Sequence, residues 1–366
     1  MQIDRRFVTH FDWPFTGTIL AMAVLGILSI YSANYLATSA FRKSLYVRQM
    51  LWVAIGFACL GLACAVSYRT LARFAYVIFG LTLVSLVVVL ILGKTGLGAQ
   101  RWIRIGGITV QPSEFAKLGL IIYLARYFDD HKDHLHQPRT LLAPAGLTLL
   151  CTLLVLKQPD LGTAVLLGFI AVGMSLLLGL RFRYLVPFIA GGGILAPVLW
   201  HFMKEYQRRR LLVFVNPDVD PLGASYHIAQ SKIAVGSGGF FGKGWLGATQ
   251  SQLNFLPLNH TDFIFAVLSE QWGFLGCLVI LLTFFFLISR GFQIARDSTD
   301  FFATLLTAGI SLMLAVQVLI NVAMVLGMLP VVGIPLPLLS YGGSSVVVTM
   351  VSFGLLLNVH MRRFMY

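Results

Sequence analysis

Long apolar stretches are the feature of this chain that most constrains its fold. Hydrophobic residues make up 58% of the 366 residues and charged residues only 11%, and about ten stretches are nearly free of charge. An apolar stretch of roughly twenty residues spans a bilayer as an α-helix, because a helix satisfies its own backbone hydrogen bonds there. The sequence therefore predicts an all-α polytopic membrane protein that forms a single integral membrane domain over residues 1–366.

The predicted spans are separated by short polar connections and by one long connection. The long one, residues 204–261, lies between the seventh and eighth spans and retains apolar residues such as Trp245 and Phe255. We expect it to be a folded functional element rather than a linker, with a short helix over Ala224–Val235. The ten spans run over Phe15–Ser32, Val47–Ser67, Phe74–Gly93, Ser113–Phe128, Thr140–Leu156, Gly162–Leu180, Tyr184–Met203, Asp262–Ser289, Phe302–Met328 and Ser340–His360.

The basic residues indicate topology rather than nucleic-acid binding. The net charge is +13, and most Lys and Arg residues of the short loops fall on the side that also carries both termini. Short cytoplasmic loops are enriched in Lys and Arg, so we expect both termini in the cytoplasm and the long loop outside. A nucleic-acid-binding protein would carry a solvated basic face on a soluble domain, and we find no such domain in the sequence.

Asp262 stands where the long loop meets the eighth predicted span. It follows Asn259-His260-Thr261 and precedes the apolar run that begins at Phe263. A carboxylate at this boundary can contact a water-borne head group while the lipid tail of the same molecule stays in the membrane. Two interpretations are open. In the first, Asp262 or the neighbouring Thr261 caps the following helix. In the second, Asp262 acts as a general base.

Candidate anion-binding residues lie in the same long loop. Arg208 and Arg210 belong to a run of three arginines, which is either a solvated charged face or a phosphate site, because guanidinium groups bind phosphate oxygens in pairs. Lys243 lies in a glycine-rich stretch, Gly236–Gly244, where the backbone can approach a ligand closely. His260 is two residues before Asp262 and is a candidate to orient it.

Three further charged residues lie in or beside the predicted spans. Glu114 and Lys117 are three residues apart and therefore share one face of a helix. They form either a structural ion pair or part of a substrate cavity, since ionisable residues in a membrane are usually paired or functional. Asp160, in the turn before Gly162, either caps the next helix or holds a partner cation. No cluster of ligand residues predicts a metal site, although a divalent ion could assist.

Eight motifs in order resemble one known family of membrane proteins. This chain is similar to the SEDS family of shape, elongation, division and sporulation proteins, and it is closer to the RodA branch than to the FtsW branch. One departure is the segment NFLPLNHTD, which lacks a charged residue near Leu258 or Asn259. The motifs, which extend from Gly98 to Ser345, are GAQRWI, QPSEFAK, QPDLGT, YQRRR, DPLGASYHIAQSKIAVGSGGFFGKGW, TQSQLNFLP, HTDFIFAVLSE and PLPLLSYGGSS.

The resemblance implies a peptidoglycan glycosyltransferase of the bacterial inner membrane. Such an enzyme polymerises lipid II into β-1,4 glycan strands on the outer face during cell elongation. It works with a class B penicillin-binding protein, which supplies transpeptidation, and with other elongation-complex proteins. No bound cofactor is implied.

In that reading Asp262 is the general base. Arg208, Arg210 and Lys117 stabilise the pyrophosphate leaving group, while Glu114 and Asp160 set the position and protonation of Lys117 and its neighbours. Two rival functions stay open: a transporter that flips lipid II, and a non-catalytic scaffold for the penicillin-binding protein.

Overall fold

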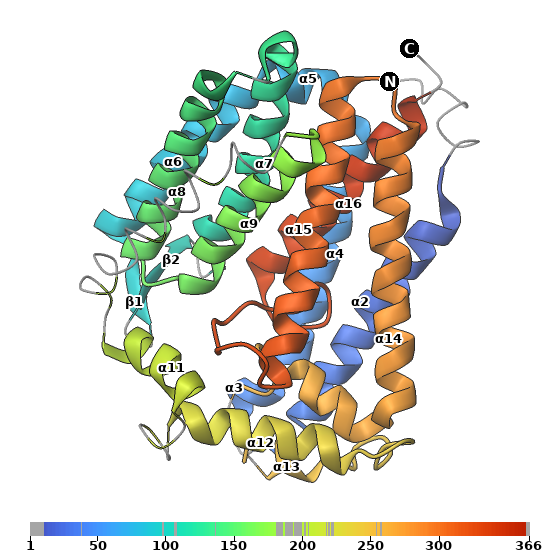
Figure 1. The fold of residues 1–366 in the computed structure, drawn as a ribbon. Coiled ribbons are helices and arrows are strands. Elements are labelled where there is room, and N and C mark those ends of the chain that lie inside the picture. Colours follow the sequence, from blue (N-terminus) through green and yellow to red (C-terminus); the bar gives the residue numbers. More distant parts are fainter. Residues whose placement is uncertain are drawn as a thin grey trace.

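The protein is an elongated bundle of long helices that run between two ends (Figure 1). This computed structural model describes residues 11–37, 39–96, 99–105, 108–135, 137–180, 186, 193, 200, 203, 205–216, 218, 220, 223–253, 255–256 and 258–363. The long helices are α2 (Trp13–Ala33), α4 (Leu45–Ala65), α6 (Ala75–Leu92), α7 (Pro112–Asp130), α8 (Leu142–Lys157), α9 (Leu161–Leu177), α14 (Ile264–Asp297), α15 (Phe301–Val325) and α16 (Gly343–Arg362).

Most of the predicted spans are confirmed as helices. Within the described residues, seven helices are long and apolar enough to cross a membrane, and they correspond to the first three, the fifth and the last three predicted spans. The fourth and sixth predicted spans correspond to α7 and to the shorter apolar helix α9. The seventh predicted span, Tyr184–Met203, falls almost wholly outside the described residues. The prediction of an all-α polytopic membrane protein is therefore confirmed.

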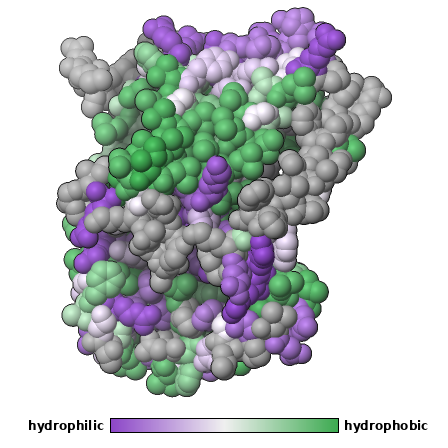
Figure 2. Space-filling model, turned by 90° about the vertical axis from the view of Figure 1, so that its left-hand side faces the viewer, coloured by the Kyte–Doolittle hydropathy of each residue, from purple (hydrophilic) through white to green (hydrophobic). Residues whose placement is uncertain are grey.

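The bundle has an interior and a lipid-facing periphery. The apolar windows of α16 and α15 are 83% and 67% buried, whereas those of α4 and α14 are only 22% buried. A helix that exposes mostly apolar residues must face lipid rather than water. Figure 2 shows this on the side formed by α6 and α8, where a hydrophobic band lies beneath a hydrophilic rim.

A small antiparallel sheet replaces the simple connection expected between α6 and α7. Its strands are β1 (Lys94–Gly96), β2 (Ala99–Ile105) and β3 (Ile108–Val110), in the order β1-β2-β3. Thr95 pairs with Gln100, and Arg104 pairs with Thr109. This sheet was not predicted, and it matters because β2 carries Arg101 toward the turn between α8 and α9.

Short helices connect the long ones, and three of them, α11 to α13, cover one end of the bundle. The predicted helix over Ala224–Val235 is confirmed as α12, which packs on α15 through a hydrogen bond from Ser231 Oγ to the carbonyl oxygen of Val325 (2.7 Å). In Figure 1, α11, α12 and α13 lie at the end of the bundle opposite α5. The connecting helices are α3 (Ala40–Lys43), α5 (Tyr68–Arg73), η1 (Lys132–His134), η2 (Pro138–Leu141), α11 (Glu205–Val215), α12 (Ala224–Ser237) and α13 (Thr249–Gln252).

Candidate functional site

Asp262 lies in a turn immediately before α14. The helix begins at Ile264, and its N-cap residue is Phe263, which makes no side-chain cap bond. Thr261 Oγ1 donates instead to the carbonyl oxygen of Leu258 (3.2 Å). Neither Thr261 nor Asp262 therefore occupies the cap position, and the capping interpretation of Asp262 is wrong.

The backbone around Asp262 is held by two distant segments. Asn321 Nδ2, on α15, donates to the carbonyl oxygens of Asp262 (3.1 Å) and Ile334 (2.7 Å). Ser340 Oγ donates to the carbonyl oxygen of Thr261 (2.6 Å). The backbone N–H of Tyr341 donates to the carbonyl oxygen of His260 (2.8 Å). These bonds fix the backbone of the Asp262 turn to α15 and to the loop before α16.

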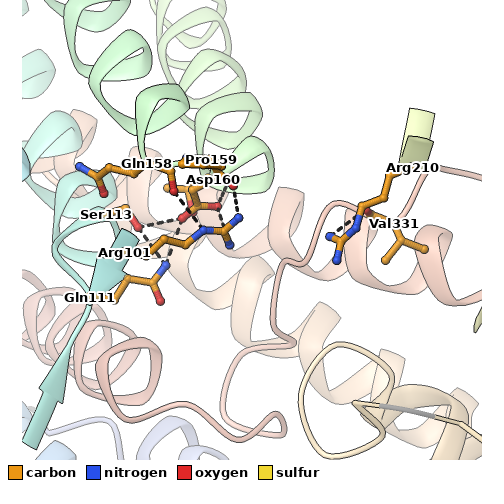
Figure 3. A network of polar contacts seen from close by, with 9 residues as sticks. Arg101, Gln111, Ser113, Gln158, Pro159, Asp160, Arg210 and Val331 are labelled. Carbon is orange, nitrogen blue, oxygen red and sulfur yellow. Dashed lines mark hydrogen bonds and ion pairs between the residues drawn. The ribbon is translucent and has the colours of Figure 1, made fainter. Parts of the chain in front are cut away.

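The Asp262 carboxylate and the Arg210 guanidinium both lie near Gly333. A Cβ atom at Gly333 would lie 3.5 Å from Asp262 Oδ2 and 3.9 Å from Arg210 Nη1. Arg210 Nη1 also donates to the carbonyl oxygen of Val331 (3.4 Å), as Figure 3 shows. The backbone of Gly333 has a φ of +77°, a conformation that glycine adopts without strain. An acid from the turn before α14 and an arginine from α11 thus lie near the same glycine.

Three other charged groups influence the protonation of Asp262. Burial raises the pKa of the Asp262 carboxyl above the ordinary value of 3.8, and the negative charge of Asp160 also raises that pKa. The positive charges of Arg210 and Arg101 lower the pKa of Asp262. Residues from α11, β2 and the α8–α9 turn therefore act on one carboxylate.

Asp160 is both a helix cap and the centre of a polar cluster (Figure 3). Its Oδ1 accepts the N–H of Thr163 (3.3 Å) at the start of α9, which confirms the cap interpretation. Its Oδ2 accepts from Ser113 Oγ (2.9 Å) and Gln111 Nε2 (3.0 Å). Arg101 Nη1 lies 4.0 Å from Oδ1, so the predicted partner cation is present as well.

Arg101 is the site residue that the sequence analysis missed. Its Nε donates to the carbonyl oxygen of Gln158 (3.2 Å), and its Nη2 donates to that of Pro159. In Figure 3 its guanidinium group lies against the turn that carries Asp160. The GAQRWI motif was the only signal in the sequence, because the partners of Arg101 are remote in the chain.

Glu114 and Lys117 form a buried ion pair within α7. Lys117 Nζ lies 2.7 Å from Glu114 Oε2, and the two side chains are only 2% and 6% exposed, respectively. This geometry supports the structural interpretation of the pair, since a buried charge needs a close partner. The contact of Lys117 with a substrate stays a prediction.

The remaining predicted residues make contacts of their own. Lys243 Nζ lies 2.7 Å from Oε1 of Glu270, a fully buried residue of α14. Arg208 Nε donates to the carbonyl oxygen of Trp200 (2.8 Å). His260 Nδ1 contacts Asn259 Oδ1 (3.1 Å) rather than Asp262. Burial and the nearby Arg42 lower the pKa of His260 to about 4, which keeps its ring neutral at pH 7.

The structure also bears on metal binding. Across the part of the chain that the structure describes, no three His, Cys, Asp or Glu side chains gather closely enough to hold a metal ion.

The fold and this site define a multi-pass helical membrane protein with a carboxylate, Asp262, in the turn before one of its long helices. Comparison with known proteins gives the family. This chain belongs to the family of cell cycle proteins that comprises FtsW, RodA and SpoVE, whose family model matches residues 13–364. The family resemblance of its motifs is confirmed.

Named relatives cover nearly the whole chain. The peptidoglycan glycosyltransferase MrdB of Escherichia coli is 40% identical over 355 residues, covering 97% of this chain and 94% of the relative. A probable peptidoglycan glycosyltransferase FtsW of Trichlorobacter lovleyi is 38% identical over 363 residues, covering 96% of this chain and 93% of the relative.

Solved structures support the same fold. One is a chain from a study of how a peptidoglycan synthase complex coordinates polymerization and crosslinking. It is 32% identical, has a TM-score of 0.82, and covers 97% of this chain and 99% of its own. Another is the rod shape determining protein RodA of Thermus thermophilus, which is 31% identical with a TM-score of 0.70. That match covers 97% of this chain and 98% of RodA.

Proposed function

We propose that this chain is a peptidoglycan glycosyltransferase that polymerises lipid II into β-1,4 glycan strands during cell elongation, with Asp262 as general base. The observation that carries the proposal is that the Asp262 carboxylate and the Arg210 guanidinium both lie near Gly333, close enough for Arg210 to lower the pKa of Asp262. An acid beside cations suits a reaction that removes a proton and releases a pyrophosphate. The names of relatives that are 40% and 38% identical support this reaction class.

Asp262 would act on the hydroxyl group that attacks. The 4-hydroxyl of a lipid II sugar forms a bond to the anomeric carbon of the growing chain, while the bond from that carbon to undecaprenyl pyrophosphate breaks. Displacement inverts the α-linked carbon and gives a β-linked glycan. The hydroxyl proton passes to Asp262, whose pKa burial raises, so its carboxylate is a stronger base than that of an ordinary aspartate.

Arginines would stabilise the departing pyrophosphate. Negative charge develops on the leaving group, and fixed cations lower the energy of that transition state without needing to reorganise. Arg210 and Arg101 are the cations that act electrostatically on Asp262. Asp160 and the Gln158 carbonyl hold Arg101 in place. Arg208, two residues before Arg210, is a further candidate for the same pyrophosphate.

The other predicted residues have supporting roles in this proposal. Glu114 holds Lys117 in position for the pyrophosphate, which their 2.7 Å contact supports. Lys243 fixes the glycine-rich stretch to α14 through Glu270, next to the lipid-linked substrate. His260, neutral at pH 7, fixes the Asp262 turn through its backbone bond to Tyr341.

The proposal includes a location and a partner. The protein would lie in the bacterial inner membrane with both termini in the cytoplasm and Asp262 on the outer face. The chain from the peptidoglycan synthase complex, whose study couples polymerization to crosslinking, supports a class B penicillin-binding protein as the partner. Lipid II and membrane lipid would be the small-molecule partners, and other elongation-complex proteins would join the assembly.

Asp262→Asn in purified protein supplied with lipid II tests the general base. We expect the polymerisation rate to fall by about 10²–10⁴, the usual contribution of a general base. Asp218→Asn, an exposed acid of the same loop, is the matched control and should keep the wild-type rate. The thermal stability of the Asp262→Asn variant should be unchanged, because Asp262 is not a helix cap. A near wild-type yield of polymer from Asp262→Asn would remove Asp262 as the base.

The same preparation separates the rival functions. Polymer formed in detergent, without any membrane gradient, supports the enzyme. Lipid II that crosses reconstituted vesicles without forming polymer supports a transporter instead. A scaffold is indicated if the penicillin-binding protein still binds the Asp262→Asn variant and wild-type protein never forms polymer, with or without that partner.

A further inference from the structure

A cavity of about 360 Å³ lies at the end of the bundle far from Asp262. Phe302, at the start of α15, forms part of its wall, whereas Asn321, which holds the Asp262 turn, lies near the end of the same helix. The cavity is therefore separate from the proposed catalytic site. Its lining residues are Arg69, Ala72, Arg73, Arg126, Asp129, Asp300 and Phe302.

The cavity lies at the level where helices leave the membrane. Its residues Arg69 and Arg73 belong to α5, a short helix that joins two candidate spans, Ala40–Ala65 and Ala75–Leu92. The residues that flank α5, Val66 and Phe74, expose 52% and 50% of their surface. Exposed apolar residues at the ends of two spans place α5 in the interfacial layer, which is where lipid head groups lie.

Three arginines and two aspartates line the cavity wall. Arg126 is paired within α7, with Asp129 Oδ2 at 3.4 Å and Asp130 Oδ1 at 2.7 Å. Asp300 Oδ1 accepts the N–H of Phe302 (3.0 Å) and so caps α15. Both acids of the wall thus have structural contacts, and the three arginines outnumber the two acids.

The two arginines of α5 are arranged to act together. Arg69 and Arg73 are four residues apart on one helix, so their side chains share a face. Both residues are exposed, and both line the cavity together with the buried Ala72 and Phe302. Two arginines and two apolar residues in one wall match a phosphate that is joined to an apolar tail.

We propose that this cavity binds the phosphate of a membrane phospholipid head group, held by Arg69 and Arg73. The volume lies within the range of about 300–1,000 Å³ that is usual for small-ligand sites. Basic pockets between membrane helices recognise anionic head groups, whose phosphates lie at this depth. The acyl chains would lie along the exposed apolar surface beside Val66 and Phe74.

Native mass spectrometry with added phosphatidylglycerol tests this site directly. The test variant is Arg69→Gln/Arg73→Gln, and the matched control is Lys132→Gln/Arg139→Gln. The control removes the same charge from exposed residues outside the cavity lining. We expect the test variant to bind phosphatidylglycerol about tenfold or more weakly, and the control to differ less than about twofold. Both variants should melt at the wild-type temperature, which shows that they are folded.

Each other outcome would contradict the proposal. Equal loss of lipid binding in the control would show that the protein responds only to total charge. Unchanged binding in a folded test variant would show that these arginines do not hold the lipid. Displacement of the lipid by glycerol 3-phosphate at similar concentrations would assign the cavity to a water-soluble phosphate compound. Binding that is insensitive to salt would also contradict a phosphate contact at an exposed arginine pair.

Discussion

The protonation of Asp262 is set by a balance between burial and nearby charge. Burial and Asp160 raise the pKa of the carboxyl, whereas Arg210 and Arg101 lower it. A general base works only as the carboxylate, so activity should be present above this pKa and lost as the pH falls through it. The acid limb of the rate profile should therefore lie above the ordinary aspartate value of 3.8.

Removal of Arg210 should move that limb in a defined direction. Arg210→Gln deletes the largest influence that lowers the pKa of Asp262, so the acid limb should shift to higher pH. The maximal rate should also fall, because a cation beside the leaving group is lost. Initial rates of polymerisation across a pH series measure both effects. An acid limb that stays in place or shifts to lower pH would show that Arg210 does not act on the base.

The sequence predicts some of these residues and not others for a physical reason. Asp262 stands out because a carboxylate at the start of an apolar run is costly and therefore informative. Its rejection as a helix cap needed the structure, because the chain makes a further turn before α14 begins at Ile264. Arg101 was missed because its partner Gln158 is 57 residues away, and only the folded chain brings them together.

At the scale of the elements, helix α14 is interrupted where the glycine-rich stretch Gly236–Gly244, called here the glycine-rich loop, contacts it. Gly273, inside the helix, has φ of +64° and ψ of −162°, a combination that only glycine adopts without strain. The loop replaces the lost helical hydrogen bonds. Phe274 N–H donates to Gly239 O (2.9 Å), and Lys243 N–H donates to Glu270 O (2.9 Å). The kink and the loop therefore stabilise each other.

Gly273→Ala should separate that loop from α14. The new Cβ would overlap the backbone nitrogen of Gly242 and lie 2.7 Å from the carbonyl oxygen of Phe240, so the loop must move away. We expect the free energy of unfolding to fall by about 2–5 kcal/mol. We also expect proteolysis to become faster within Gly236–Gly247.

Gly168→Ala in α9 is the control for that substitution. Open space surrounds this position, so the added methyl group should stabilise the protein slightly. Thermal unfolding of both variants distinguishes the two effects. Equal stability of Gly273→Ala and wild-type protein would show that the loop is not held at the kink.

The helices could be predicted from the sequence and the small sheet could not, because different interactions stabilise them. Helices in apolar runs were predicted because hydrophobicity over about twenty residues determines a span. The span Phe302–Met328, for example, is confirmed as α15 (Phe301–Val325). The sheet of β1, β2 and β3 was missed because two of its strands have only three residues. Such short strands carry no periodic pattern, and pairing partners elsewhere in the fold stabilise them.

At the scale of the molecule, the two proposed sites lie at opposite ends of the bundle. Both ends of the described chain attach to the last turns of α14, through Asp12 Oδ2 with Arg290 Nε (2.6 Å) and Asp297 Oδ2 with Arg363 Nη1 (2.6 Å). The proposed catalytic residues and the helices α11 to α13 lie at the other end (Figure 1). The proposed phospholipid site is at the end that carries the chain ends, so the two proposed sites face opposite sides of the membrane.

Cysteine labelling in intact cells tests this orientation. Asp218 and Asp133 are exposed residues of the two ends, so Asp218→Cys and Asp133→Cys place one thiol on each side. The positive-inside distribution of Lys and Arg predicts Asp133 in the cytoplasm and Asp218 outside. An impermeant maleimide should label Asp218→Cys directly and Asp133→Cys only after the membrane is permeabilised. Wild-type protein, with its four free cysteines, sets the background. The reverse pattern would put Asp262 in the cytoplasm, where an acid could not act on substrate delivered to the outer face.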